Sequence, residues 1–238
     1  MKETLKQDHA YYGEEGKAYL SNSDIDALIK NPKKFKAKSE DDKAFAMGRY
    51  FHQLMLEPEK AAETPMIDVS TRGTKTYKEA AGDDKFILLT NEAIEVQSWV
   101  DTIKSNYPFY EAIYDSANKF EEPSVCEIAG EMWKGKADIV TPTNVIDLKT
   151  TGDITSFRWN AKKYNYDSQA YIYSKLFGKP LLFYAIDKET LMLGVFTPSR
   201  DFLESGKAKV EKAVENYRKF FGEGANESLN DYYITEVI

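Results

Sequence analysis

The sequence predicts an α/β fold in which a central mixed β-sheet is flanked by helices. Residues 131–151 and 181–196 each contain two strand-like runs separated by a short turn. In residues 42–56 and 200–221, apolar side chains recur at helical spacing. The chain has 238 residues, of which 42% are hydrophobic and 30% charged, so it is long enough for one sizeable domain with its own core.

The stretch 131–151 carries the strongest strand signal. Thr141 to Asn144 supplies a turn, because Pro presets one backbone angle and Asn tolerates tight geometry. The run after this turn is rich in β-branched and apolar residues, which is typical of a strand. Side chains alternate between the two faces of a strand, so Asp147 and Lys149 share one face while their apolar neighbours point into the core.

Asp138, on the first strand of this hairpin, is expected to lie across from Asp147. Two carboxylates about 4 Å apart repel each other by about 4 kcal/mol at an effective dielectric near 20, so the pair needs a cation or a shared proton. A hard divalent ion such as Mg²⁺ takes oxygen ligands, and Lys149 beside it can hold the attacking water. The alternative is an ordinary hairpin with a solvated Asp-Lys-Asp face.

Two predicted helices flank this hairpin in the sequence. The first spans 42–56, and it places Gly48 and His52 one turn apart on one face. The second spans 167–177, and it places Gln169 and Tyr173 on one face by the same rule. A lone helical histidine is usually structural, and a tyrosine at this spacing also suits a packing face, so both alternatives stay open.

The other elements are predicted in chain order. Residues 1–20 are expected to form a polar arm, and Ser23 and Asp26 to cap the helix that follows. The region 57–85 is expected to be rich in loops. It is either a substrate-facing segment or an insertion. The remaining expectations are strands at 86–89 and 125–129, a helix capped by Thr90, one domain over 21–222 and a tail over 223–238.

The residues at these positions resemble the PD-(D/E)xK nuclease superfamily. Its signature is an acidic residue on one strand and an acidic-x-Lys triplet on the next, which Asp138 and Asp147-Leu148-Lys149 match. Gly48 to His52 resembles the G-x-x-x-H element of the RecB-like branch, and Gln169 to Tyr173 resembles its Q-x-x-x-Y element. Within this branch the chain looks most similar to the phage and prophage exonuclease VIII (RecE-type) group, over about residues 20 to 200.

The resemblance implies a restriction-endonuclease-like core and a metal-dependent active site. In it, His52, Asp138 and Asp147 hold one or two Mg²⁺ ions, and Mn²⁺ substitutes because it accepts imidazole well. Lys149 and Gln169 act with the two aspartates in catalysis. Some relatives add an upstream glutamate. Here Glu127 is favoured for that role and Glu131 competes with it, because Val125 and Glu127 can share the face opposite Cys126.

The substrate is expected to be DNA. The net charge of −7 counts against a protein that coats DNA nonspecifically, but between residues 133 and 179 Lys and Arg outnumber Asp by eight to four. The side chains expected to contact DNA are Gln169, Tyr173, Arg158, Lys162 and Lys163. For each of the charged ones, a solvated surface position is the alternative.

The RecE-type resemblance implies an exonuclease that digests linear double-stranded DNA from 5′ to 3′. Its 3′ overhangs would serve a single-strand annealing partner, and relatives form ring-shaped homo-oligomers. The alternatives are a structure- or site-specific endonuclease and an inactive nuclease-like DNA-binding module. The single Cys126 excludes an internal disulfide and a Cys₄ iron–sulfur cluster. With no signal peptide or membrane span evident, we expect a cytoplasmic protein of a bacterial or phage-infected cell.

Overall fold

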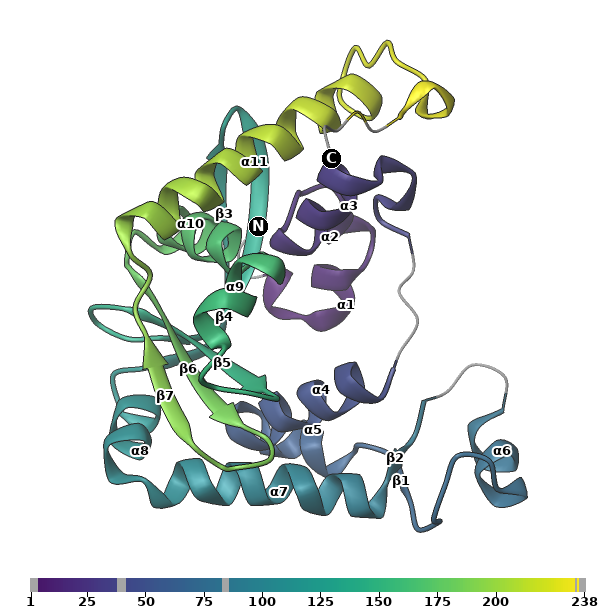
Figure 1. The fold of residues 1–238 in the computed structure, drawn as a ribbon, viewed down its shortest axis with the longest axis vertical. Helices are drawn as coiled ribbons and strands as arrows, with labels where there is room; N and C mark the ends of the chain where they lie inside the picture. The colour runs from purple at the N-terminus through teal and green to yellow at the C-terminus, as the bar shows by residue number, and fades with distance from the viewer. Residues whose placement is uncertain (1–3, 38–41, 83–85, 234, 236–238) are drawn as a thin grey trace.

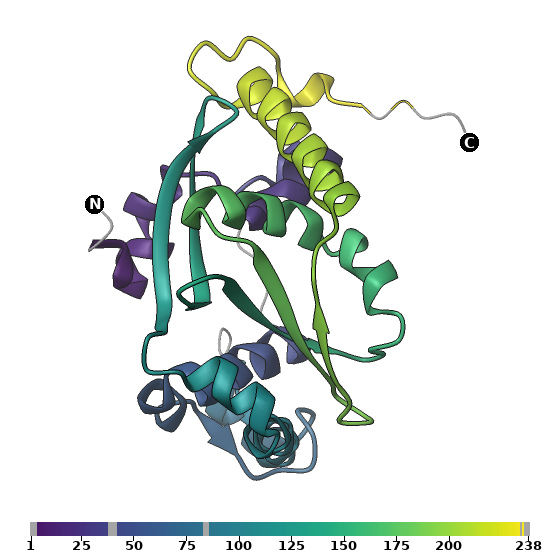
Figure 2. The same cartoon turned by 90° about the vertical axis from the view of Figure 1, so that its left-hand side faces the viewer.

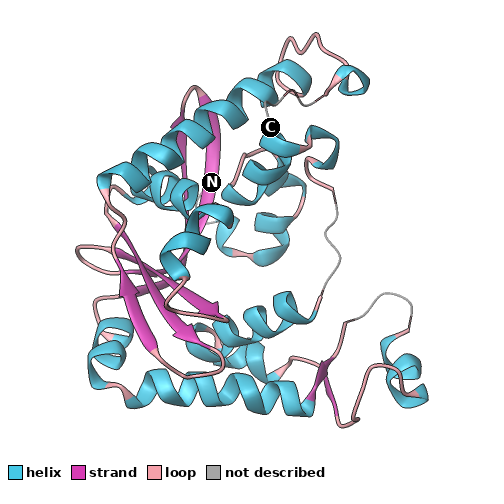
Figure 3. Cartoon of the chain, in the orientation of Figure 1, coloured by secondary structure: helices cyan, strands magenta, loops and turns pink. Residues whose placement is uncertain are grey.

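The computed structural model describes residues 4–37, 42–82, 86–233 and 235. Among these residues, a five-stranded mixed sheet of order β3-β4-β5-β6-β7 forms the centre (Figures 1 and 3). Its strands are β3 (Lys119–Ile128), β4 (Glu131–Val140), β5 (Val145–Thr151), β6 (Leu181–Asp187) and β7 (Leu193–Phe196). Only the β5–β6 pair is parallel within this sheet. The predicted α/β fold with a central mixed sheet is confirmed.

Helices cover both faces of the sheet (Figure 2). One layer contains α9 (Phe157–Lys163), α10 (Tyr166–Phe177) and α11 (Arg200–Phe220), with α3 (Ile25–Lys30) packed on α11. The other layer contains α4 (Lys43–Leu56), α7 (Thr90–Ser105) and α8 (Tyr107–Tyr114). Each layer encloses its own apolar core, and Ile146 and Leu148 belong to the core beneath α4 and α7, as the strand pattern predicts.

The hairpin of β4 and β5 forms as predicted. Its turn is closed by the amide of Thr141, which donates to the carbonyl of Asn144 at 2.9 Å. The ladder between these two strands has two pairs, Ile139 with Ile146 and Val140 with Val145. Beyond Ile139 the strands diverge and β5 continues along β6. Polar side chains at the point of divergence therefore face a gap in the ladder and can reach groups from both helical layers.

A tight turn sets the register of β3 against β4. Ala129 and Gly130 both have positive φ, at 55° and 79°, which is the conformation of a two-residue type I′ hairpin loop. The pairs therefore run regularly from Ile128–Glu131 next to the turn to Lys119–Val140 at the far end. β3 is twice as long as the strand expected at 125–129, because it continues back through residues 119–124.

The segment before residue 21 is folded against β4, which corrects the expectation of a polar arm. It contains η1 (Thr4–Lys6), α1 (Asp8–Tyr12) and α2 (Glu14–Lys17). Leu20 pairs with β4 through hydrogen bonds to Met132 and Lys134, and the buried Lys134 amine donates to the carbonyl of Tyr11. Burial lowers the pKa of Lys134 to about 8. Residues 1–3 of this predicted arm lie outside the described residues.

The loop-rich region after α4 contains short elements around a small cluster of its own. These are α5 (Pro58–Ala62), β1 (Met66–Ile67), α6 (Lys75–Ala81) and β2 (Leu88–Leu89), with β1 and β2 paired in parallel. The buried residues of the cluster are Tyr77, Ala81, Ile87 and Leu89. Arg72 ties the region to α7 through two contacts with Glu92, at 2.5 and 2.7 Å. Residues 83–85 of the predicted loop region lie outside the described residues.

The remaining short helices are η2 (Asn22–Asp24), η3 (Pro32–Lys34) and η4 (Leu229–Asp231). At the start of η2, ahead of α3, the amide and the hydroxyl of Ser21 both donate to the Asp24 carboxylate at 2.8 Å, so the capping pair is Ser21 and Asp24 rather than the expected Ser23 and Asp26. Across the described ranges, we find no helix with the length and apolarity that a bilayer crossing requires. The division into a domain over 21–222 and a tail over 223–238 stays a prediction.

Candidate active site

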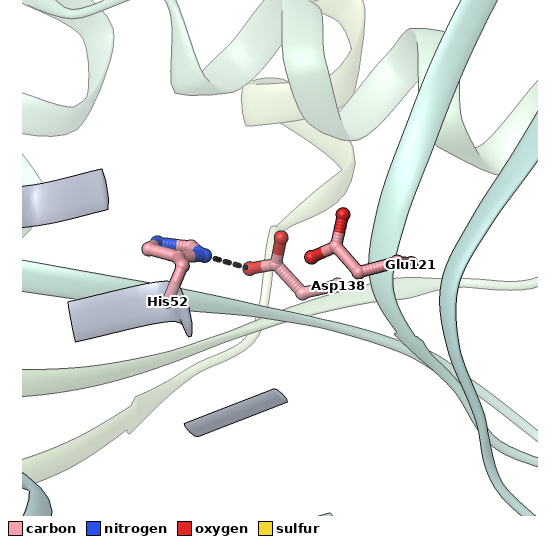
Figure 4. A group of neighbouring side chains, drawn as sticks. All are labelled: His52, Glu121 and Asp138. Atoms are coloured by element: carbon pink, nitrogen blue, oxygen red, sulfur yellow. Dashed lines mark ion pairs between the residues drawn. The ribbon is translucent and has the colours of Figure 1, made fainter. Parts of the chain in front are cut away.

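Four elements bring ionisable side chains together where β4 and β5 diverge. His52 comes from α4, Glu121 from β3, Asp138 from β4, and Asp147 and Lys149 from β5. Figure 4 shows the first three pointing toward one another, with the imidazole on one side and the two carboxylates on the other. Residues 86 positions apart in the sequence thus share one site.

The closest group consists of His52, Glu121 and Asp138. Each offers one ligand atom, and these atoms all lie within 4.8 Å of one another. His52 Nδ1 is 3.3 Å from Asp138 Oδ2. The same oxygen accepts a hydrogen bond of 2.7 Å from the amide of Leu148, which fixes the carboxylate against β5. The geometry thus places the predicted residues His52 and Asp138 side by side.

Glu121 is the site residue that the sequence reasoning missed. The hairpin register pairs Phe120 with Ile139 and Glu122 with Ala137, so Glu121 lies opposite Asp138. Its φ of 48° lies in the left-handed region, which is rare for a glutamate and frequent at functional sites. The signal was present in the sequence, because a two-residue turn at Ala129-Gly130 fixes residue 121 as the partner of Asp138.

The expectations for Glu127 and Glu131 are wrong, because both lie at the opposite end of the β3–β4 hairpin. Glu127 pairs with Met132 one step from the turn, and its side chain is exposed. It is six residues, or about 20 Å of strand, from Glu121. Glu131 forms an ion pair of 2.6 Å with Arg218 on α11. The additional acidic group of this site therefore comes from the other end of β3.

Asp147 lies beside this group and is held by two neighbours. Its Oδ1 accepts a hydrogen bond of 2.5 Å from the Nε2 of Gln169 on α10, and its Oδ2 is 2.5 Å from the Nζ of Lys149. The Lys149 ammonium also lies 4.7 Å from the ring centre of Tyr166. Asp147 and Lys149 thus share a face of β5 as predicted, and Gln169 orients the aspartate.

The charges of the site perturb one another strongly. Burial raises the pKa of Asp147, and the Asp138 charge adds to this effect. Burial also acts on Asp138, but His52, Lys149 and the Leu148 amide outweigh it and lower the pKa of that carboxyl. For Glu121, burial and then the nearby Asp138 and Glu57 charges raise the pKa to about 8. The pKa values of the two aspartates are therefore shifted in opposite directions, which is typical of catalytic carboxylates.

These residues fit a divalent cation. The donors of the closest group are one imidazole nitrogen and carboxylate oxygens, a set that suits Mg²⁺ and Mn²⁺. Beside this group, the buried Oδ2 of Asp147 is paired with the Lys149 ammonium at 2.5 Å. Burial and, after it, repulsion from neighbouring carboxylates raise the pKa of Glu121 and Asp147, and a cation would offset this repulsion.

Tyr173 lies one turn after Gln169 on α10, but its hydroxyl is directed at the protein. It donates a hydrogen bond of 2.9 Å to the carbonyl of Lys136 on β4, and its side chain is buried. Gly135 makes room for this contact, because a Cβ at that position would be 3.0 Å from the Tyr173 ring. The hydroxyl expected to contact DNA is thus used to hold β4 against α10.

We predict that Tyr173→Phe lowers the free energy of unfolding by about 1 kcal/mol, because the Lys136 carbonyl loses its donor. Urea unfolding measures this change. Cleavage of DNA should stay within about twofold of the wild-type rate, since one hydroxyl facing the protein is removed. A large loss of DNA affinity at unchanged stability would instead assign the hydroxyl to the substrate.

The basic residues expected to contact DNA lie together on α9. Arg158, Lys162 and Lys163 are exposed on this helix, while Phe157 and Ala161 are buried against the sheet. α9 starts six residues after the end of β5. The structure therefore leaves these three cations open to solvent on the helix that follows the strand carrying Asp147 and Lys149.

Comparisons with known proteins agree with the fold. A family model described as a PDDEXK-like domain of unknown function (DUF3799) matches residues 19–226. The crystal structure of a candidate exonuclease from Eubacterium rectale superposes with a TM-score of 0.65 at 18% identity, covering 98% of this chain and 95% of that one. A phage-related exonuclease from Haemophilus somnus 129PT gives 0.37 at 16% identity, covering 84% and 94%, which is too low to support an argument. A search of curated proteins finds no match.

Proposed function

The chain belongs to the PDDEXK-like family DUF3799, and from this premise we propose that it is a divalent-metal-dependent deoxyribonuclease. The observation that carries the proposal is the convergence of His52, Glu121 and Asp138 within 4.8 Å next to the Asp147–Lys149 pair. A DNA-binding module has no use for an imidazole, carboxylates and a buried ammonium in this arrangement. An inactive module is therefore the weaker alternative.

Each residue has a chemical role in this proposal. His52, Glu121, Asp138 and Asp147 would hold Mg²⁺ or Mn²⁺, and a bound ion would supply a water of lowered pKa and neutralise charge on the phosphate. Lys149 holds the attacking water and stabilises the negative charge that develops on the phosphoryl oxygens. Gln169 keeps the Asp147 carboxylate in one orientation by its hydrogen bond of 2.5 Å.

The direction of digestion and the partners belong to the same proposal. We infer an exonuclease that acts on linear double-stranded DNA from 5′ to 3′ and leaves 3′ overhangs for a single-strand annealing protein. A ring-shaped homo-oligomer would keep such an enzyme on its strand. These inferences are supported by the D-x-K, G-x-x-x-H and Q-x-x-x-Y elements, which resemble the RecE-type group, and by the fold shared with the Eubacterium rectale protein.

Incubation with linear and circular duplexes of one sequence tests this function. With Mg²⁺, the linear duplex should be shortened from its ends, while a covalently closed circle should stay intact. EDTA should stop the reaction, and Mn²⁺ should restore it. Cleavage of the closed circle would identify an endonuclease. A linear duplex that survives with its binding intact would identify a binding module. End labels on either strand then show the direction of digestion.

A further inference from the structure

The outer surface of α9 combines exposed aromatic rings with cations. Trp159 is 67% exposed and Tyr164, directly after the helix, is 57% exposed. The guanidinium of Arg158 stacks at 4.0 Å from the centre of the Trp159 ring, and Lys163 Nζ is 5.8 Å from that of Tyr164. One cation lies near each ring, and both rings are nevertheless exposed to solvent. We call Arg158, Trp159, Lys162, Lys163 and Tyr164 the α9 surface.

The helix beneath this surface is firmly anchored. Phe157 stacks on Phe196 of β7 at 4.1 Å and also packs on Phe183 of β6. At the other end, Lys209 of α11 donates to the Lys162 carbonyl at 2.6 Å. Figure 1 shows α9 on the same side of the sheet as α10 and α11. The exposed rings are therefore held on a fixed support, so little ordering is needed when a ligand stacks on them.

A chain of rings leads from the α9 surface to the proposed nucleophile-activating lysine. The Tyr164 ring lies 5.9 Å from that of Tyr166, and Tyr166 lies 4.7 Å from the Lys149 ammonium. Lys149 in turn contacts Asp147 at 2.5 Å. A ligand that stacks on Tyr164 is thus two side chains away from Lys149.

The charges of the α9 surface indicate the ligand. Over the described ranges, no carboxylate forms an ion pair with Arg158, Lys162 or Lys163, whereas lysines of other helices are paired within their own helix. Unneutralised cations between open rings match a strand that alternates phosphates with flat bases. Inside a duplex the faces of the bases are covered by their neighbours, so successive bases along a strand can stack on these rings only when they are unpaired.

We propose that the α9 surface binds single-stranded DNA by base stacking on Trp159 and Tyr164 and delivers that strand to Lys149. The inference rests on the proposed nuclease function and adds to it the form in which the substrate reaches the site. The duplex must then open near its end before cleavage, and the α9 surface holds the opened strand.

The three tryptophans of the chain provide a direct readout. Trp99 and Trp133 are 1% and 0% exposed, so Trp159 alone is accessible to a ligand. The Lys149→Ala protein in Mg²⁺ is titrated with oligothymidylate and with an abasic oligonucleotide of equal length. We expect oligothymidylate to quench the emission of Trp159 and to bind about tenfold more tightly than the abasic strand, because stacking needs bases.

Variants separate the contribution of the rings to binding from the contribution of the cations. Trp159→Ala with Tyr164→Ala lacks the fluorescent reporter, so its binding is followed by the anisotropy of end-labelled oligonucleotides. This variant should bind oligothymidylate about tenfold or more weakly and leave abasic binding unchanged. Tyr107→Ala, which removes a 70% exposed tyrosine of α8, is the matched control and should change neither. Replacing Arg158, Lys162 and Lys163 by Gln should lower the slope of log K against log salt by about 2, at about 0.7 per phosphate contact.

The outcomes distinguish this inference from the nuclease proposal. If the wild-type protein cleaves linear duplex but both oligonucleotides bind equally and leave Trp159 emission unchanged, the α9 surface is not a stacking site. If oligothymidylate quenches Trp159 but the wild-type protein cleaves nothing, single-strand binding stands and the nuclease proposal falls. Equal binding by the ring variant would assign the rings to a protein partner and overturn the proposal.

Discussion

Replacing Lys149 by alanine is expected to abolish cleavage while the protein stays folded and still binds metal. The side chain is largely buried, touches Asp147 and lies over the Tyr166 ring, and we propose that its ammonium holds the attacking water. Loss of one such group from a preorganised site costs about 10²–10³ in rate. Single-turnover cleavage of end-labelled duplex measures the loss, and circular dichroism reports the fold.

A matched control strengthens this test. Lys207→Ala removes an exposed lysine of α11 that pairs with Glu211 of the same helix, and it should leave cleavage unchanged. Lys149→Arg keeps the charge but not the compact ammonium, so it should recover little activity. Cleavage by Lys149→Ala at the wild-type rate would remove the lysine from the mechanism.

The second large effect is expected for Asp138→Asn, which should abolish metal binding together with cleavage. Asp138 lies between His52 at 3.3 Å and Glu121 across the hairpin, so it is the central carboxylate of the group. The asparagine oxygen can still accept from the Leu148 amide, so the fold should be retained. Isothermal titration with Mn²⁺ should show binding by the wild type and none by the variant.

Two substitutions on β3 complete this test. Glu121→Gln should weaken Mn²⁺ binding at least tenfold, because it removes a carboxylate from the group. Glu127→Gln makes the same chemical change at the other end of the strand, on an exposed residue, and should have no effect. Normal Mn²⁺ binding by both Asp138→Asn and Glu121→Gln would show that the metal site lies elsewhere.

The sequence predicts the β4–β5 hairpin and the shared face of Asp147 and Lys149 because these signals are local. The turn at 141–144 and the alternation through Asp147 and Lys149 follow from backbone geometry alone. The PD-(D/E)xK resemblance, confirmed by the family match, supplies the long-range link to His52 that periodicity cannot give. The role of each residue in catalysis stays a prediction until the variants are measured.

The misses have physical causes of two kinds. The sequence does not point to Glu121, because its position depends on the register of a hairpin and the predicted strand 125–129 includes Ala129, which belongs to the turn. The N-terminal segment was expected to be an arm because its sequence is polar. Its stability comes from tertiary contacts instead, including the link from Asp8 to Lys60 and Lys136 at 2.6 Å each. Local composition does not reveal contacts between residues that are far apart in the sequence.

The pairing of Leu20 with Trp133 has a practical consequence for anyone who shortens this protein. Without the residues before 21, the backbone amides and carbonyls near Trp133 would be bare along one side of β4. Uncovered strand edges recruit strands from other molecules. A version that begins at residue 21 should therefore self-associate and precipitate on concentration, even with every ionisable group of the site intact.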